Sequence, residues 1–253
     1  MEGAKSGMTQ TKSLIDENGK RTDGRTETEL REIKINVGVI KNADGSAFIE
    51  FGMNKILAAV YGPREVHPKH MAQPDRCVLR CRYHMTPFST DTRKNPAPSR
   101  REVEISKVMR EALEPALMLQ DYPRAAIDVY VEVLQADGGS RCAGITAASV
   151  ALADAGINMR DIVAACAAGK INGKIVTDIN DTEDKEGEAD MPVAYMPHLD
   201  QVTLLQLDGI LDDKQFTECL DEAVRGCKVV YEIQRRALMQ KYFGEETEMK
   251  EEQ

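Results

Sequence analysis

Residues 178–190 read DINDTEDKEGEAD and place seven carboxylates in thirteen positions between two apolar stretches. Carboxylates held close together between buried segments repel one another, so they lower stability unless a cation or a chemical task needs their charge. A solvated acidic loop is the simplest alternative. No start within the run fits the EF-hand pattern, because the sixth position counted from Asp178 is not glycine. Asp184, within the run, and Asp190, where the next strand is expected, could instead hold Mg²⁺ together with substrate oxygens.

A glycine-rich turn, GGSR, is the second candidate, and it lies between an expected strand and an expected helix. Free backbone N–H groups at a helix N-terminus attract anions, and glycines let a ligand approach the backbone closely. Gly139, Ser140 and Arg141 could therefore bind phosphate. A serine that only caps the helix is the alternative, and the segment matches neither a Walker loop nor a dinucleotide-binding fingerprint.

Two adjacent arginines begin another expected helix. The sequence SRRE over residues 99–102 is a capping box, which places Arg100 and Arg101 in the first two helical positions. Cations at these positions oppose the helix dipole and cost about 0.3–1 kcal/mol each. Their presence favours an anion such as RNA phosphate at this terminus, with ordinary surface arginines as the alternative.

Charge is unevenly distributed along the chain. The net charge of −9 would by itself argue against a polyanionic partner. However, residues 64–110 hold eleven Lys or Arg against five Asp or Glu, whereas residues 178–200 hold eight acidic residues and one lysine. A basic stretch combined with a carboxylate cluster favours phosphate chemistry assisted by a divalent metal.

Hydrophobic periodicity predicts the elements that must position these residues. Strands alternate with helices, Asn172 and Gly173 predict a type I′ hairpin, and the first three strands predict a meander. The order indicates an α+β fold of two similar sheet-and-helix halves. The expected strands are 33–41, 47–52, 55–61, 76–86, 126–135, 161–168, 174–179, 191–196 and 201–207, and the expected helices are 99–115, 142–155 and 213–242.

The chain divides into a core and two terminal segments. Residues 1–19 are expected to be flexible, and residues 244–253 form an acidic tail that is expected to be disordered. The catalytic domain is expected over residues 20–243, with a first half at about 20–157 and a second half at about 158–243.

Cysteine usage and hydropathy indicate a cytoplasmic protein. The six cysteines include no CxxC pair and lie mostly among small or apolar residues, so we expect reduced, structural thiols. A zinc site that joins Cys77 and Cys81 to a nearby histidine is an alternative, although a CxxxC spacing is unusual for zinc. No stretch approaches 18 continuous apolar residues and no signal-peptide core begins the chain, so no membrane association is expected.

The sequence resembles the RNase PH family of phosphorolytic 3′ to 5′ exoribonucleases, and within it the catalytic RNase PH-like subunits of the archaeal exosome. The resemblance covers about residues 20–240 in unbroken order. It is carried by RTDGRTETELR, FGMNKILAAVYGPREVHP, PSRREVEISKVMREALEP, LQADGGSRCAGITAASVALADAGI and DTEDKEGEADMPVAYMP.

This resemblance implies the RNase PH fold, a ribosomal protein S5 domain 2-like arrangement. It implies that Gly139, Ser140 and Arg141 bind inorganic phosphate, the co-substrate. It also implies that Asp184 and Asp190 place the metal and the acid catalyst, with Mg²⁺ as the expected ion and Mn²⁺ as the alternative. The noncatalytic sister subunit typically departs from these positions, whereas this chain keeps them.

RNA contacts follow from the same resemblance. Arg100 and Arg101 match the arginine pair that contacts the RNA backbone. Arg64, His67 and Lys69 lie in a segment that resembles the lining of the narrow RNA entrance of the ring. With few aromatic residues and no tryptophan, base stacking is limited, so little sequence preference is expected.

The implied activity is Mg²⁺-dependent phosphorolysis of RNA to nucleoside diphosphates, which is reversible as RNA tailing. The implied partners are RNA, a sister noncatalytic RNase PH-like subunit in a hexameric ring of three heterodimers, and RNA-binding cap proteins. Two alternatives remain open at this point: a homohexameric RNase PH that trims transfer-RNA 3′ ends, and a noncatalytic ring subunit that only binds RNA.

Overall fold

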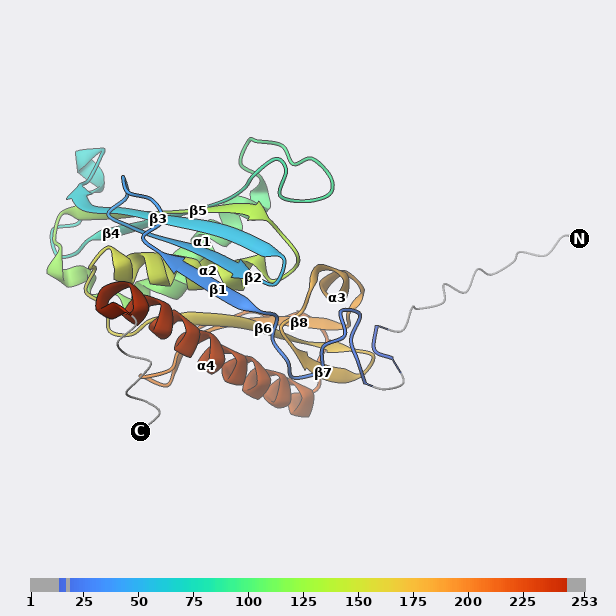
Figure 1. Ribbon diagram of the computed structural model, residues 1–253. Coiled ribbons are helices and arrows are strands. Elements are labelled where there is room, and N and C mark those ends of the chain that lie inside the picture. Colours follow the sequence, from blue (N-terminus) through green and yellow to red (C-terminus); the bar gives the residue numbers. More distant parts are fainter. Residues whose placement is uncertain (1–13, 17–18, 245–253) are drawn as a thin grey trace, which may run out of the picture.

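The computed structural model describes residues 14–16 and 19–244 of the chain and contains two five-stranded sheets (Figure 1). The segments expected to be flexible or disordered, 1–19 and 244–253, therefore lie largely outside the described residues. Among the described residues, no helix is both long enough and apolar enough to cross a membrane.

The first sheet has the strand order β1-β2-β3-β5-β4. Its first three strands form the predicted antiparallel meander, while β4 pairs with β5 in parallel. The sequence predicts that β3 ends at residue 61, before Gly62 and Pro63, yet it continues to Glu65 because a register shift accommodates these residues. The strands are β1 (Ile33–Val37), β2 (Gly45–Phe51), β3 (Asn54–Glu65), β4 (Val78–Met85) and β5 (Ala125–Gln135).

The second sheet has the order β10-β8-β6-β7, and β9 also pairs with β8. The predicted type I′ hairpin joins β6 to β7, since Asn172 and Gly173 both have positive φ, at 49° and 76°. The strands are β6 (Ala164–Ile171), β7 (Lys174–Thr177), β8 (Ala189–Met196), β9 (Gln201–Leu205) and β10 (Asp208–Gly209).

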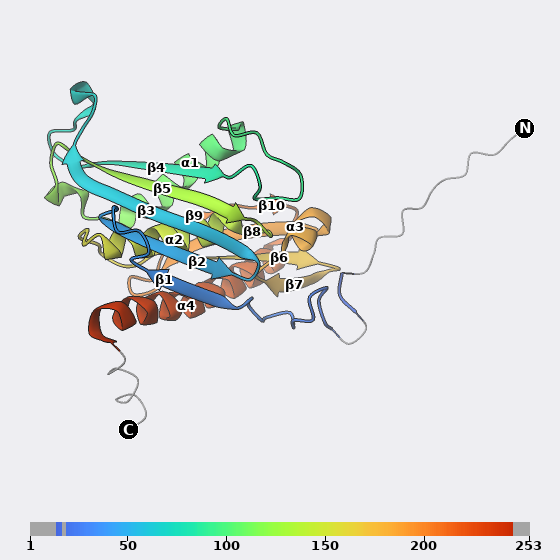
Figure 2. The same ribbon diagram turned by 45° about the horizontal axis from the view of Figure 1, so that its top comes forward.

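Helix α2 (Ser140–Asp154) lies between the two sheets and contacts strands of both (Figures 1 and 2). Its buried residues are mostly alanine, glycine and serine, which let both sheets approach the helix axis closely. Helix α1 (Arg100–Leu113) packs on β4 and α2, and the 3₁₀ turn η2 (Glu114–Ala116), which contains Pro115, follows it near the expected helix end at residue 115. Helix α4 (Asp213–Phe243) covers the second sheet and reaches β1. The remaining 3₁₀ turns are η1 (Lys69–Met71) and η3 (Leu119–Asp121).

The acidic run is not a loop throughout, because it contains the short helix α3 (Asp181–Glu186). Asn180 caps this helix by accepting hydrogen bonds from the backbone N–H groups of Thr182 and Glu183. The Glu183 side chain accepts in return from the Asn180 N–H, which completes a capping box. Local capping therefore forms a helix where charge repulsion alone predicts an irregular segment.

Gln234 on α4 joins α2 to the segment before β6 through hydrogen bonds. It is fully buried, and its Nε2 donates to the carbonyl oxygens of Thr146 and Val163 at 3.1 and 3.0 Å. We predict that Gln234→Met lowers the free energy of unfolding by about 1–3 kcal/mol, because two hydrogen bonds are lost at constant side-chain volume. Chemical denaturation measures this loss. The exposed Gln240→Met on the same helix is the matched control, and an equal effect of both substitutions would contradict the cross-link.

Candidate active site

The glycine-rich turn leads into a helix N-terminus that no side chain caps. Gly138 and Gly139 both have φ of 64°, and a Cβ on Gly138 would lie 2.4 Å from the Asn180 backbone. Helix α2 begins at Ser140, two residues earlier than predicted, and its N-cap is Gly139 with no side-chain cap. Ser140 is thus not the N-cap, and the first amides of α2 have no side-chain capping group.

Two side chains that sequence reasoning missed hold the polar groups of this turn. The Ser140 hydroxyl shares a 2.8 Å hydrogen bond with the hydroxyl of Tyr83, which is 2 % exposed. Burial raises the pKa of Tyr83 above its usual value, so this phenol stays neutral. Arg141 donates from Nη1 to the Oε1 of Gln206, which follows β9. Both contacts orient groups that the sequence assigns to phosphate.

Asn54, at the start of β3, fixes the backbone of the turn. Its Nδ2 donates to the Gly138 carbonyl at 2.7 Å, and its Oδ1 accepts from the Asp137 N–H at 2.8 Å. The residue is fully buried, so neither bond competes with water. The only local signal of this role is a polar residue at the start of an apolar strand.

The two predicted carboxylates come from different elements, Asp184 from α3 and Asp190 from β8. In the sheet, Asp190 lies opposite Gly169 on one side and Asp208 on the other. Directly opposed residues of antiparallel strands share a face, so Asp208 adds a third negative charge beside Asp190. The sequence offered no signal for Asp208, because its role depends on strand register.

Electrostatic coupling connects the carboxylates to the arginines. Burial and the charge of Asp184 raise the pKa of Asp190 to about 7, against the effect of Arg141 and Arg101. Partial desolvation also raises the pKa of Asp184, and the same two arginines oppose it. The structure therefore brings Arg101, Arg141 and both aspartates into one charged site. Arg100 lies beside Arg101, exposed, at the first residue of α1.

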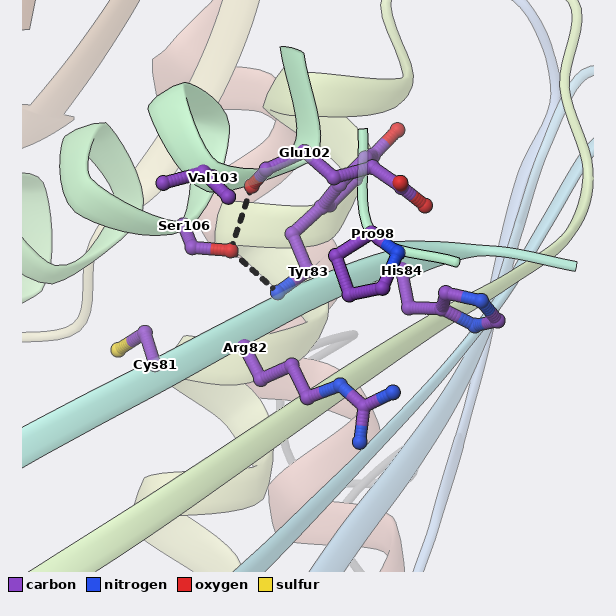
Figure 3. Close-up of a pocket in the computed structure, with 8 residues that line it drawn as sticks. All are labelled: Cys81, Arg82, Tyr83, His84, Pro98, Glu102, Val103 and Ser106. Carbon is purple, nitrogen blue, oxygen red and sulfur yellow. Dashed lines mark hydrogen bonds between the residues drawn. The ribbon is translucent and has the colours of Figure 1, made fainter. Parts of the chain in front are cut away.

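Hydrogen bonds beside a groove between β4 and α1 hold the start of α1, which carries the arginine pair (Figure 3). The Tyr83 N–H donates to the Ser106 hydroxyl at 2.9 Å, and this hydroxyl donates to the Glu102 carbonyl at 2.6 Å. The Glu102 carboxylate accepts from the N–H groups of Met85 and Ser99 as well, the latter within the predicted capping box. The edge of β4 thus fixes the N-terminus of α1.

The site suits a hard divalent cation such as Mg²⁺. The Oδ1 atom of Asp190 is buried and lacks a hydrogen-bond partner, and the available donors are carboxylate oxygens. Within residues 14–16 and 19–244, no group of three or more His, Cys, Asp or Glu side chains could hold a metal ion. A carboxylate pair fits Mg²⁺, which takes one or two carboxylates plus water and substrate oxygens.

The alternative zinc site at Cys77 and Cys81 has no support among the described residues, since no such ligand group forms there. All six cysteines are free, and five are buried. Burial raises the pKa of Cys77 to about 11 and that of Cys81 to about 12. These thiols are inert parts of the core, as the sequence indicated.

Arg64, His67 and Lys69 lie apart from the charged site. Asn54 at one end of β3 touches the glycine-rich turn, whereas Arg64 is ten residues further along this strand, roughly 33 Å at about 3.3 Å per residue. Turn η1, which contains Lys69, lies at the opposite end of the molecule from α3 in both views (Figures 1 and 2). Arg64 pairs with Asp44 at 3.0 Å, so it is fixed but exposed.

Two domain profiles match the chain. Residues 29–158 match domain 1 of the 3′ exoribonuclease family, RNase PH, and residues 161–226 match domain 2 of the same family. The exosome complex component Rrp41 of Nitrosopumilus maritimus is 63% identical over 238 residues, which are 94% of this chain and 98% of the relative. The component of the same name from Thermococcus kodakarensis is 65% identical over 229 residues, 90% of this chain and 92% of the relative.

Solved structures share the fold. Rice (Oryza sativa) Rrp46 superposes with a TM-score of 0.79 at 21% identity, covering 87% of this chain and all of that chain. A chain of the Archaeoglobus fulgidus exosome with RNA bound to the active site gives 0.74 at 24% identity, covering 85% and 92%. The α+β fold of the family is thereby confirmed.

Because the pKa of Asp190 is raised, the free energy of unfolding should depend on pH. Folded Asp190 holds its proton up to about pH 7, whereas the unfolded residue releases it near 3.8, so stability falls as pH rises between these values. We predict that Asp190→Asn leaves unfolding free energy similar at about pH 4 and raises it by about 2–4 kcal/mol at about pH 8. Denaturation of metal-free protein at both values measures the difference.

The exposed loop residue Asp91 gives the control, and Asp91→Asn should show no such pH dependence. An Asp190→Asn variant whose stability follows that of the wild type at both pH values would mean that Asp190 ionises without strain.

Proposed function

Because the chain belongs to the RNase PH family of 3′ exoribonucleases, we propose that it is the catalytic subunit of an exosome complex and degrades RNA from its 3′ end by phosphorolysis. One observation carries the proposed chemistry: Arg101 and Arg141, the latter from the glycine-rich turn, both act electrostatically on Asp184 and Asp190, so the four residues form a single charged site. A subunit that only binds RNA gains nothing from a buried carboxyl group whose pKa is raised, as it is for Asp190.

In the proposed reaction, inorganic phosphate lies at the turn, held by Ser140, Arg141 and the first amides of α2. One of its oxygens attacks the phosphorus of the 3′-terminal phosphodiester. The new P–O bond forms as the bond to the 3′ oxygen of the preceding nucleotide breaks. The products are a nucleoside 5′-diphosphate and an RNA one nucleotide shorter with a free 3′ hydroxyl, and the reverse reaction lengthens RNA.

Catalysis in this site consists of positioning and charge neutralisation. Phosphate is already an anion at neutral pH, so no protein nucleophile is needed, but two anions must be brought together. Arg141 and Arg101 offset this repulsion and the charge that develops on the transferred phosphoryl group. The departing 3′ oxygen takes up a proton. Burial and the charge of Asp184 raise the pKa of Asp190 to about 7, so its protonated carboxyl is suited to provide that proton while Asp184 and substrate oxygens hold the metal.

Asp184 would hold the Mg²⁺ ion, and Asp190 would join it when its carboxyl is ionised. When bound, the ion neutralises negative charge on the phosphoryl oxygens of the substrates. Asp184 is exposed, and the buried Oδ1 of Asp190 has no hydrogen-bond partner among the described residues, so each carboxylate has an oxygen that an ion could bind.

RNA would reach this site from the far end of β3. Arg64, His67 and Lys69 contact the strand at the entrance in this proposal, and Arg100 and Arg101 hold its backbone beside the carboxylates. The roughly 33 Å between the two regions, from about 3.3 Å per strand residue, favours single-stranded substrates long enough to touch both.

The relatives named exosome component Rrp41 are 62–65% identical over most of the chain, which favours exosome assembly over a homohexameric RNase PH. By the same resemblance, the subunit pairs with a noncatalytic sister in a ring of three heterodimers that carries RNA-binding cap proteins. The six free cysteines are compatible with a reducing compartment, which supports the cytoplasm as the location.

The activity test uses the full-length chain assembled with its sister subunit, labelled RNA, Mg²⁺ and inorganic phosphate. We predict phosphate-dependent release of nucleoside diphosphates, and we predict that Asp190→Asn lowers kcat by about 100-fold or more because the proton and metal site is lost. The RNA dissociation constant should change little. Thin-layer chromatography of the released nucleotide and filter binding measure the two effects.

Nucleoside monophosphates as products would indicate hydrolysis and refute phosphorolysis. Turnover of Asp190→Asn at the wild-type rate would remove Asp190 from the mechanism, and Asp91→Asn again serves as the exposed control.

If Arg100 and Arg101 contact RNA phosphates, their removal should change the salt dependence of RNA binding. Replacing Arg100 and Arg101 by glutamine should weaken RNA binding and reduce the slope of log K against log salt by about 0.7 for each lost phosphate contact. Binding is measured without phosphate at several salt concentrations. Arg160→Gln, just beyond the C-terminal end of α2, is the control and should leave the slope unchanged. A double variant with the wild-type slope would identify Arg100 and Arg101 as ordinary surface charges.

A further inference from the structure

The segment RTDGRTETELR contributes three buried arginines behind the site, and the proposed chemistry assigns them no role. Arg21, Arg25 and Arg31 are each at most 9% exposed. They converge on two carboxylates of the acidic run, Asp178 and Glu183, which are 3% and 1% exposed. Buried charges of this kind persist only when they are paired and fully hydrogen-bonded.

Arg31 makes the most extensive contact with Asp178. Its Nε donates to Oδ2 at 2.9 Å and its Nη2 to Oδ1 at 2.7 Å, a forked pair, and its backbone N–H donates to Oδ2 at 2.8 Å. Burial alone would lower the pKa of Arg31, but Asp178 raises it above its usual value, so the guanidinium stays charged. Asp178 itself has a positive φ of 58°, a conformation that this cluster holds in place.

The other side of the same guanidinium reaches the glycine-rich turn. Its Nη1 donates to the carbonyl oxygen of Asp137, and its Nη2 approaches the carbonyl oxygen of Gly138 at 3.4 Å. Nη2 also donates to the carbonyl of Ile179, next to Asp178, at 3.2 Å. One buried side chain thus bonds directly to the segment before α2 and to the segment before α3.

We infer that Arg31 is a positioning residue that sets the distance between the phosphate-binding turn and the carboxylate pair. This inference rests on the proposed function. The turn and α3 come from different halves of the chain, so the separation between bound phosphate and Asp184 depends on a link between them. A planar guanidinium offers donors in fixed directions to both sides, and a lysine ammonium cannot reproduce this fork.

Arg25 provides a matched comparison, because it bonds to the same carboxylate but does not link the two segments. Its Nη1 donates to Asp178 at Oδ2 and at the backbone carbonyl, at 3.1 and 3.0 Å. The other hydrogen bonds that its side chain makes among the described residues go to Asp23 and to the Glu29 carbonyl, and its Nη2 lies 3.9 Å from a Glu183 oxygen. Arg25→Lys therefore disturbs the buried cluster while the contacts to residues 137 and 138 remain.

The experiment compares Arg31→Lys with Arg25→Lys in the full-length chain assembled with its sister subunit. Arg31→Lys should lower kcat/KM for inorganic phosphate by about 10- to 100-fold, because small misplacements of reacting groups have effects of this size. RNA affinity should stay within about twofold, and Arg25→Lys should stay within about twofold of wild type in all constants. Thermal unfolding of both variants reports the shared loss of stability.

Equal phosphate constants for the two variants would overturn the inference, because Arg31 would then be only a structural residue. If Arg31→Lys does not assemble, Arg31→Ala prepared with millimolar guanidinium replaces it. Guanidinium, but not methylammonium, should then restore phosphate-dependent turnover, and failure of this rescue overturns the inference as well. A wild-type complex that releases no nucleoside diphosphate would instead refute the proposed function, which separates the two failures.

Discussion

The pairing of buried arginines with Asp178 and Glu183 is the interaction on which the rest of the site depends. Removing either partner would leave an uncompensated charge in the interior, at a cost of about 3–5 kcal/mol. These pairs hold Asp178 at its positive φ and hold Glu183, which completes the capping box of α3. Arg31 also bonds to the Asp137 carbonyl and so links this cluster to the glycine-rich turn. The acidic run therefore serves two purposes: its buried members, Asp178 and Glu183, hold the fold, and Asp184 and Asp190 are the members proposed to face the substrates.

The site brings together negative charges that repel one another and therefore lower the stability of the fold. Asp190 lies between Gly169 and Asp208 in the sheet, with Asp184 nearby, and the positive charges of Arg101 and Arg141 offset the repulsion. In the proposed reaction, a cation would supply positive charge to the carboxylates and an RNA end would supply negative charge to the arginines, which would relieve this repulsion. In the free protein, the stability of the rest of the fold offsets the repulsion.

The first sheet relates this site to the distant basic segment. Strand β3 touches the turn through Asn54 at one end and carries Arg64 at the other, so the length of one strand separates the proposed entrance from the site of reaction. Because β3 is the central strand of its sheet, it is paired on both sides and resists deformation. A rigid strand would keep the proposed RNA entrance at a constant distance from the proposed site of reaction.

Features that depend on neighbours along the chain can be predicted from the sequence alone. These are the capping box at Ser99, the Asn172-Gly173 turn, the meander and the glycine turn before α2, whose signals need only a few adjacent residues. Four contacts became visible with the folded structure: Tyr83 with Ser140, Gln206 with Arg141, Asp208 with Asp190, and Arg31 with Asp178. These partners lie 57, 65, 18 and 147 residues apart. Such pairs depend on strand register and helix packing, which no local pattern encodes.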